Sequence, residues 1–247
     1  MVIRMLAWCN HDLIQHLRNT YTLVMNPDDY EYRDRVNIDS LKREVNTVAT
    51  RLSKILGMDR EFIKNTLAIS AYLHDIGKAI RYYQNILQSQ CGKDEERISL
   101  KGHELMSMWV AYHAFNTLNV KPKEPFLAGI ALHHSARRSI DEAYIGLMKN
   151  LTLTHNDVEN IIAVLKELGE LSKSQLDTDY IAVWLHQDID QIVKLKIDDY
   201  IRELVNSGVS KYGELVTYVI SIVDDIDSYI NRKGFTPVII HEFLKYF

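Results

Sequence analysis

Apolar residues recur along most of the chain at intervals of three and four, the spacing of a helix that buries one face. The clearest case covers residues 38–56, where the apolar positions are Ile38, Leu41, Val45, Val48, Leu52 and Ile55. Gly57 follows, and a glycine directly after the last periodic residue is typical of a helix end. The pattern therefore predicts a helix over residues 38–56.

The next stretch predicts a second helix that begins after Asp59, a residue type that caps helix N-termini. Its core-facing positions are Ile63, Leu67, Ser70 and His74, at intervals of 4, 3 and 4. Gly77 is expected to end this helix. An imidazole is therefore expected on or beside the face that packs against the core.

Further helices are predicted over about residues 100–118, 124–138, 155–169, 176–206 and 211–231. The apolar positions of the last helix are Leu215, Val219, Ile222, Ile226 and Tyr229. Two stretches between helices are predicted to be loops: residues 26–37, which start with Asn-Pro, and residues 89–98, which contain Gly92 and an acidic run. The whole chain is predicted to be all-α.

The composition favours long helices in a single domain. The 247 residues include 10 glycines and 4 prolines, about half of the share found in average proteins. Such a chain has too few turn residues for a sandwich or a barrel. The length is about 1.6 times that of a typical domain. No internal repeat is present, so we expect one domain over residues 1–247.

Charge, apolar stretches and cysteines narrow the function classes. Lys and Arg total 29 against 33 Asp and Glu, a formal net charge of -4, so nucleic acid would have to be held by local groups. We expect no membrane span, no signal peptide and no P-loop for ATP. The spacing of Cys9 and Cys91 fits neither a zinc site nor a disulfide framework. These features suit a cytoplasmic protein.

The 10 histidines carry the strongest signal for chemistry. Residues 73–78, Leu-His-Asp-Ile-Gly-Lys, put an imidazole beside a carboxylate at a helix end, where both side chains can reach one ion. His103 follows 29 residues after His74, and the pair His133 and His134 starts 30 residues later. Each interval corresponds to about one helix and its connection. The spacing therefore predicts a metal site in the interior of the helical bundle.

A single histidine on an apolar helix face is more often a hydrogen-bonded core residue than a metal ligand. We expect such structural roles for the histidines outside the pattern: His11, His113, His155, His186 and His241. The combination of H-D-x-G-K, a later histidine after a glycine, and a His-His pair in this order is different, because the three would rarely occur together by chance.

These motifs resemble those of the HD-domain superfamily of metal-dependent phosphohydrolases. In detail they are similar to the HD nuclease of type I CRISPR interference in its form as a separate polypeptide. Lys-Gly-His-Glu-Leu-Met-Ser at 101–107 is similar to the middle motif of that group, and Leu-His-His-Ser at 132–135 to its paired-histidine motif. Val-Asp-Asp-Ile-Asp-Ser at 223–228 is similar to its closing Ala-Asp-x-x-x-Ser helix. The resemblance covers nearly the whole chain and implies an HD-domain helical bundle.

The family has an early histidine on its first helix, in a setting like Leu-x-x-His-Leu. Residues 13–17, Leu-Ile-Gln-His-Leu, fit this setting, so the resemblance assigns the role of the early histidine to His16 rather than to His11. His74 stands 58 positions after His16, a larger separation than the family usually has. This difference indicates a loop insertion near residues 26–37.

At the other end of the chain, three aspartates compete for one ligand position. Asp224, Asp225 and Asp227 all lie off the apolar stripe of the last helix, so periodicity leaves the choice open. The spacing to Ser228 in the family motif favours Asp224. The alternative is that all three belong to a solvated acidic face.

The resemblance, carried over residue by residue, implies two divalent metal ions. The first ion would be held by His16, His74, Asp75 and Asp224. The second would be held by Asp75, His103, His133 and His134, so that Asp75 bridges the two. Five imidazoles favour Mn, Fe, Co, Ni or Zn over Mg, which prefers oxygen ligands but stays a candidate.

Two such ions activate water and stabilise the charge that develops on phosphate oxygens, as the hydrolysis of a phosphodiester requires. Asp75 and Lys78 are the catalytic candidates. Protonated Lys78 cannot be a ligand, but it lies one turn from His74 and could neutralise the phosphate or hold the attacking water.

A local basic rim is a second expectation. Arg137 and Arg138 follow the paired histidines, and Lys121 and Lys123 precede the same helix, so these residues could bind a nucleic-acid strand. The alternative is that they are ordinary surface residues. Bases could stack on tyrosines near the H-D motif, namely Tyr72, Tyr82 and Tyr83.

The resemblance implies a metal-dependent nuclease that hydrolyses DNA in CRISPR interference, with single-stranded DNA preferred and RNA as a further candidate substrate. Its implied partners are a separate ATP-dependent helicase subunit and the CRISPR surveillance complex. One alternative is an HD phosphohydrolase of free or cyclic nucleotides. Another is a non-catalytic subunit with a structural metal, which loss of a ligand would favour; no ligand is missing.

Overall fold

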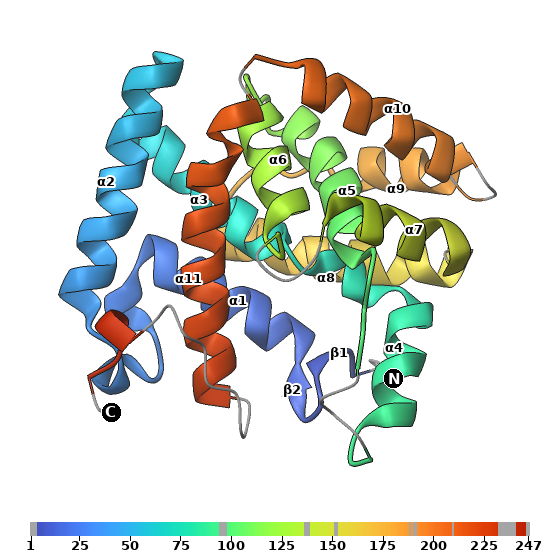
Figure 1. The fold of residues 1–247 in the computed structure, drawn as a ribbon, viewed down its shortest axis with the longest axis horizontal. Helices are drawn as coiled ribbons and strands as arrows, with labels where there is room; N and C mark the ends of the chain where they lie inside the picture. Colours follow the sequence, from blue (N-terminus) through green and yellow to red (C-terminus); the bar gives the residue numbers. More distant parts are fainter. Residues whose placement is uncertain are drawn as a thin grey trace.

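The computed structural model describes residues 4–93, 98–135, 139–150, 153–187, 189, 192–208, 210–231 and 241–245. Within these residues the chain is mostly helical, as predicted (Figure 1). The helices are α1 (Leu13–Met25), α2 (Ile38–Leu56), α3 (Arg60–Leu73), α4 (Arg81–Gln90), α5 (His103–Thr117), α6 (Glu124–Leu132), α7 (Ile140–Asn150), α8 (His155–Ser172), α9 (Thr178–Gln187), α10 (Ile192–Asn206) and α11 (Gly213–Asn231). The strands β1 (Leu6–Trp8) and β2 (His11–Asp12) form an antiparallel hairpin, which the sequence pattern did not predict.

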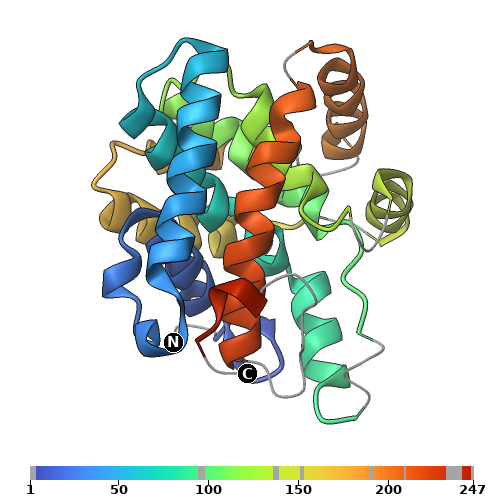
Figure 2. The ribbon, with the colours of Figure 1, turned by 60° about the vertical axis from the view of Figure 1, so that its left-hand side comes forward.

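Helix α3 is the centre of the bundle. It contacts α1, α2, α5, α6, α8 and α11, and every residue from Thr66 to Leu73 is buried. Helices α2 and α11 run beside each other on one side of α3 (Figures 1 and 2). The end of α3 therefore lies in the interior, where the helices that follow can surround it.

Local sequence signals explain the first two long helices. Helix α2 has the predicted bounds, and Gly57 ends it with a φ of 67°, a backbone conformation that costs a glycine little. The side chain of Asp59 accepts a hydrogen bond from the backbone N–H of Phe62 at 2.9 Å and so caps α3. The predicted core stripe of α2 is buried except at its ends, where Ile55 is 44% exposed.

Two helices end earlier than predicted. Helix α3 ends at Leu73 rather than at Gly77, and a short 3-10 helix, η3 (Ile76–Ala79), follows. Helix α6 ends at Leu132 rather than near residue 138. In both cases the next residue is a histidine whose imidazole bonds a carbonyl of the last turn, which satisfies a group that the helix leaves without a partner.

Other differences concern elements that the pattern could not separate. The helix predicted over 176–206 is two helices, α9 and α10, because the apolar positions 181, 185, 189 and 192 keep the helical period across the break. Helices α4 and α7 were not predicted. The predicted loop at 26–37 contains two short 3-10 helices, η1 (Pro27–Asp29) and η2 (Arg33–Arg35).

Helices α6 and α11 pack against each other at two glycines. A Cβ on Gly129 would lie 2.5 Å from the side chain of Val216, and a Cβ on Gly213 would lie 2.6 Å from that of Ala128. The hydroxyl of Ser221 also donates to the carbonyl of His133 at 3.3 Å. This close packing fixes the end of α6 against the middle of α11.

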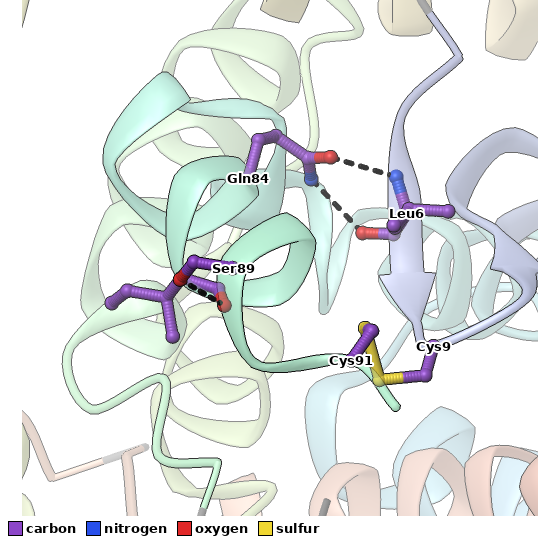
Figure 3. Close-up of a disulfide and its surroundings, with 6 residues drawn as sticks. Leu6, Cys9, Gln84, Ser89 and Cys91 are labelled. Atoms are coloured by element: carbon purple, nitrogen blue, oxygen red, sulfur yellow. Dashed lines mark hydrogen bonds between the residues drawn. A yellow bond between two sulfur atoms is a disulfide. The ribbon is translucent and has the colours of Figure 1, made fainter. Parts of the chain in front are cut away.

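The hairpin is tied to α4 by a disulfide between Cys9 and Cys91, whose Cα atoms are 5.3 Å apart (Figure 3). The side-chain amide of Gln84 bonds both the backbone N–H and the carbonyl of Leu6, at 2.8 and 2.9 Å. The expectation that these cysteines form no disulfide is therefore wrong. Their separation of 82 residues carries no pairing signal; the packing of the hairpin on α4 brings them together.

No helix in the described part of the chain is both long and apolar enough to span a membrane.

Candidate metal centre

All seven residues predicted as ligands meet at one place in the interior. His16 comes from α1, His103 begins α5, and Asp224 lies in α11. His74 and Asp75 follow α3, and the paired histidines follow α6. Their ligand atoms form two groups, each within 4.8 Å: His16, His74, Asp75 and Asp224, and Asp75, His103, His133 and His134. The two groups share Asp75, as the resemblance implied.

Gly77 explains how the H-D-x-G motif brings Asp75 to the second group. A Cβ on Gly77 would lie 2.3 Å from the backbone oxygen of His103, so only glycine lets η3 approach α5 this closely. The N–H of Gly77 also donates to the hydroxyl of Ser107 at 2.9 Å. As a result, Oδ1 of Asp75 lies 2.8 Å from Nε2 of His103.

Three of the imidazoles are oriented by the same kind of hydrogen bond to the backbone. Nδ1 of His74, His103 and His133 bonds the carbonyl three residues earlier, at 2.7, 2.6 and 2.6 Å. A carbonyl only accepts hydrogen bonds, so Nδ1 must donate and must carry the proton. In the neutral ring this leaves a lone pair on Nε2. Each ring therefore presents an unprotonated nitrogen to the centre.

Several atoms at the centre have no hydrogen-bond partner among the described residues. They are Oδ1 of Asp75 and Nε2 of His11, His16, His74, His103 and His133, all buried. Buried polar atoms are normally paired. So many unpaired nitrogens around one carboxylate fit a site that binds metal ions, because imidazole and carboxylate are common ligands of divalent transition metals.

Lys78 and the carboxylate of Asp75 form a buried pair, with Nζ 2.5 Å from Oδ2. Burial acts to raise the pKa of Asp75, but Lys78 and then His74 outweigh it and hold this pKa well below its usual range. Asp75 is therefore ionised, as a bridging ligand must be.

Burial also sets the charge of the paired histidines. It lowers the pKa of His133, and together with the neighbouring His133 it lowers the pKa of His134 well below the usual range. Both rings are therefore neutral at pH 7. Neutral imidazole is the form that binds metal.

The structure distinguishes the three aspartates of α11 among which the sequence could not choose a ligand. Oδ1 of Asp224 lies 3.4 Å from Nε2 of His16 and 3.8 Å from Nε2 of His74. Burial acts to raise the pKa of Asp224, but the neighbouring His74 and then His16 outweigh it and hold this pKa well below the usual range. Asp227 is fully buried beside His16, and Asp225 is half-buried and belongs to neither group of four. Asp224 and Asp227 are thus not on a solvated face.

His11 was expected to have only a structural role, but it lies beside the centre. Its ring centroid is 5.2 Å from that of His16, and its Nε2 is 3.3 Å from Oδ2 of Asp227. Burial, and then the charge of His16, lower the pKa of His11 to about 4. Burial acts to lower the pKa of His16, but the carboxylates of Asp227 and then Asp75 outweigh it and raise this pKa to about 10.

A cavity of about 260 Å³ opens onto the centre. Its lining includes His11 and Trp8 from the hairpin, Lys78 beside Asp75, and Lys101 before α5. Lys101 also lies 3.3 Å from Glu142. These two lysines are the basic side chains that line the cavity among the described residues.

The predicted basic rim is only partly visible. Arg137 and Arg138 lie outside the described residues. Lys121 and Lys123 lie at the start of α6, whereas His133 follows its end, so about 15 Å of helix separates them. The lysines before α6 are therefore not part of a rim around the centre.

Two of the three proposed stacking tyrosines are buried. The hydroxyl of Tyr72 donates to Val164, and that of Tyr83 donates to Lys101. Neither ring is exposed for a base. Tyr82 is half-buried against Tyr83.

The other histidines lie elsewhere, as expected. His113 packs between Trp109 and Trp184, and His155 and His186 pair with each other near the surface. His241 lies in the short η6 (His241–Phe243). None of them belongs to a metal-binding group in the part of the chain that the structure describes.

Sequence reasoning missed His11 as a neighbour of the centre, and it considered Asp227 only as a competitor of Asp224 for the ligand position, not as a second carboxylate beside the centre. A signal for Asp227 exists, because it stands three residues after Asp224 and so lies on nearly the same face of α11. His11 lies in a strand that no periodic pattern marks.

Three comparisons bear on this arrangement. A family model described as the Cas3 HD domain matches residues 36–192, more than half of the chain. The match includes His74 to His134 but neither His16 nor Asp224. The CRISPR-associated endonuclease Cas3-HD of Methanocaldococcus jannaschii is 25% identical over 224 residues, which cover 90% of this chain and 76% of that protein.

Among solved structures, the CRISPR-associated Cas3 HD domain protein from Methanocaldococcus jannaschii has a similar fold. The TM-score is 0.54 at 20% sequence identity, and the alignment covers 90% of this chain and all of the other.

Proposed function

The chain belongs to the Cas3 HD-domain family, and from this premise we propose that it is a metal-dependent nuclease that hydrolyses DNA, with single-stranded DNA preferred. The predicted HD-domain helical bundle is confirmed, as is the resemblance to a stand-alone Cas3-HD endonuclease. The chain has the buried His and Asp clusters of a metal-dependent enzyme. RNA remains a second candidate substrate, and a single domain over residues 1–247 remains a proposal.

The observation that carries the proposal is the set of unpaired nitrogens that surround the shared carboxylate of Asp75. In our proposal, the first ion is held by His16, His74, Asp75 and Asp224, and the second by Asp75, His103, His133 and His134. When bound, two divalent ions supply an activated water and neutralise charge on the phosphate. The imidazole-rich set favours Mn, Co, Ni or Fe over Mg.

Lys78 has a different role in this proposal. Its ammonium group contacts Asp75 and lines the cavity, so it can meet a phosphate oxygen there. It would orient the phosphodiester and offset its charge. Lys78 is 8% exposed, a small fraction that fits a group reached only by a substrate inside the cavity.

We expect the metal-free protein to be inactive and a transition-metal ion to restore more activity than Mg²⁺ at equal concentration. The physical reason is that five of the seven donors are imidazoles, which Mg²⁺ binds poorly. The measurement is the rate of cleavage of labelled single-stranded DNA after chelation and addition of Mn²⁺, Co²⁺, Ni²⁺ or Mg²⁺. Full activity with Mg²⁺, and no gain from Mn²⁺, would contradict the proposed ligands.

We further propose that Arg137 and Arg138 hold the nucleic-acid strand, since they follow the paired histidines in the sequence after only two residues. Replacing both with alanine is expected to raise the DNA concentration for half-maximal cleavage and to reduce the salt dependence, by about 0.7 in slope per lost contact with a single strand. Hydrolysis of a p-nitrophenyl phosphodiester should stay nearly unchanged. Replacing Lys121 and Lys123 provides the matched control, because these residues lie away from the centre. Normal DNA cleavage by the Arg137 and Arg138 variant would place the strand elsewhere.

The partners that we propose are a separate ATP-dependent helicase subunit and the CRISPR surveillance complex. Residues 1–247 contain no P-loop motif for ATP, which is compatible with a partner that supplies the ATP-driven unwinding. A helicase would deliver single strands and would compensate, by raising their effective concentration, for the net charge of -4.

Hydrolysis of free or cyclic nucleotides is the alternative, because the cavity of about 260 Å³ opens directly onto the centre. A panel of labelled single-stranded DNA, duplex DNA, RNA and nucleotides separates the two functions. Rapid turnover of a nucleotide without cleavage of DNA would overturn the nuclease proposal.

A further inference from the structure

Asp227 is the most completely enclosed carboxylate beside the centre, yet it belongs to neither group of four ligands. It is 0% exposed, and its partners come from three parts of the chain. Nδ2 of Asn19 lies 2.6 Å away, the hydroxyl of Tyr30 lies 3.0 Å away, and Nδ2 of Asn231 lies 2.9 Å away. A buried carboxylate is costly, so one that is held by three hydrogen bonds requires an explanation.

The two oxygens of Asp227 have different partners. Oδ1 accepts all three bonds from Asn19, Tyr30 and Asn231. Oδ2 lies 2.7 Å from Nδ1 of His16 and 3.3 Å from Nε2 of His11. The three donors on Oδ1 therefore fix the carboxylate so that its other oxygen faces His16.

His16 needs a carboxylate as the hydrogen-bond partner of its Nδ1, because it lacks the free backbone carbonyl that the other three imidazoles use. His74, His103 and His133 stand at helix ends and bond a carbonyl three residues earlier. His16 lies inside α1 (Leu13–Met25), where helical hydrogen bonds occupy the backbone carbonyls. A side-chain acceptor must take the place of the carbonyl.

We propose that Asp227 is a positioning residue: it keeps a proton on Nδ1 of His16 and holds the ring so that Nε2 faces Asp75 and Asp224. The distances from Nε2 of His16 to these carboxylates are both 3.4 Å. A carboxylate behind a metal-binding histidine raises the basicity of the ligand and fixes its orientation. The inference rests on the proposed metal centre and concerns only its first group.

The segment 26–37 contributes a hydrogen bond to Asp227. We expected a loop insertion there, and its Tyr30 is 2% exposed and bonds Asp227. Asp28, in the same segment, instead pairs with Lys42 near the surface. The segment thus reaches the metal centre through one tyrosine.

Asp227→Asn tests the proposal sharply. The asparagine oxygen must still accept the bonds from Asn19, Tyr30 and Asn231, so its NH₂ group takes the place of Oδ2 and faces His16. An NH₂ group cannot accept a hydrogen bond, so Nδ1 of His16 loses its proton and the neutral ring carries it on Nε2. We expect Mn²⁺ affinity to fall about 10-fold to 100-fold in the first group and to stay unchanged in the second.

The control is Asp225→Asn, which removes the same charge two positions away. A double-mutant cycle with His16→Ala distinguishes positioning from a general structural role. If Asp227 acts through His16, Asp227→Asn will cause no further loss of Mn²⁺ affinity in the His16→Ala protein. Additive losses, or an unchanged affinity in Asp227→Asn alone, would overturn the proposal.

The wild-type protein gives a second measurement that needs no variant. In Zn²⁺-loaded protein, ¹⁵N NMR should show the ring proton of His16 on Nδ1, with Nε2 bound to the ion. Zn²⁺ bound through Nδ1 would overturn the inference. A wild-type protein that binds no divalent ion at all would instead overturn the proposed function.

Discussion

Asp75→Asn will abolish nuclease activity and lower the amount of bound metal while the helical fold is retained. Asp75 is the one residue shared by both groups of ligands, and its carboxylate lies within 3.6 Å of nitrogens from His16, His74, His103 and His133. Asparagine keeps the shape but loses the charge that holds two cations. We expect cleavage to fall by more than the roughly 10-fold to 100-fold loss typical of an outer-shell residue. Cleavage of single-stranded DNA, metal content and circular dichroism are the measurements.

A buried aspartate with another role provides the control. Asp157 is as buried as Asp75, but it caps α8 through Thr154 and accepts the backbone N–H of Arg81. Asp157→Asn should therefore lower the thermal stability while metal content and cleavage per folded molecule stay near wild type. If Asp75→Asn cleaved DNA normally in a folded state, the two-ion proposal would be wrong.

Gly77→Ala is the second change with a large expected effect, although it adds only one methyl group. The new Cβ would lie 2.3 Å from the backbone oxygen of His103 and 3.0 Å from Ser107. Because backbone atoms cannot swing away, η3 and α5 must separate. We expect a loss of about 1–3 kcal/mol in the free energy of unfolding and a fall of about 100-fold in cleavage, the cost of a 1 Å misplacement at a reacting centre.

Gly208→Ala is the matched control for this substitution. A Cβ on Gly208 would have no atom within 4 Å, and its φ is not in the left-handed region. Denaturant unfolding and DNA cleavage should be near wild type for this variant. A similar result for Gly77→Ala would show that the approach of η3 to α5 does not control the centre.

The sequence was sufficient where one helix face carries the information. The stripe in residues 38–56 predicted α2 with correct bounds, and the stripe that ends at His74 placed this imidazole in the core. The intervals from His74 to His103 and to His133 predicted their meeting, because each spans one helical unit. The H-D-x-G-K motif also marked Gly77, but the close contact with His103 could be seen only after folding.

What the sequence could not predict depends on contacts between distant segments. The disulfide joins residues 82 apart, and Asp227 reaches Asn19 and Tyr30 across about 200 residues of chain. No local pattern encodes such pairings. His11 lies in a short strand, whereas the family motif describes a histidine on the first helix. The motif therefore assigned the role of the early ligand to His16 alone and gave no sign that His11 lies beside it.

The disulfide between Cys9 and Cys91 also acts on the unfolded chain (Figure 3). It closes a covalent ring that contains α1 to α4, and with them His16, His74 and Asp75. A ring of this length removes conformational entropy from the unfolded state worth about 4.5 kcal/mol. Three of the four residues of the first group therefore stay within one closed loop when the protein unfolds, and only Asp224 must be recruited from outside it.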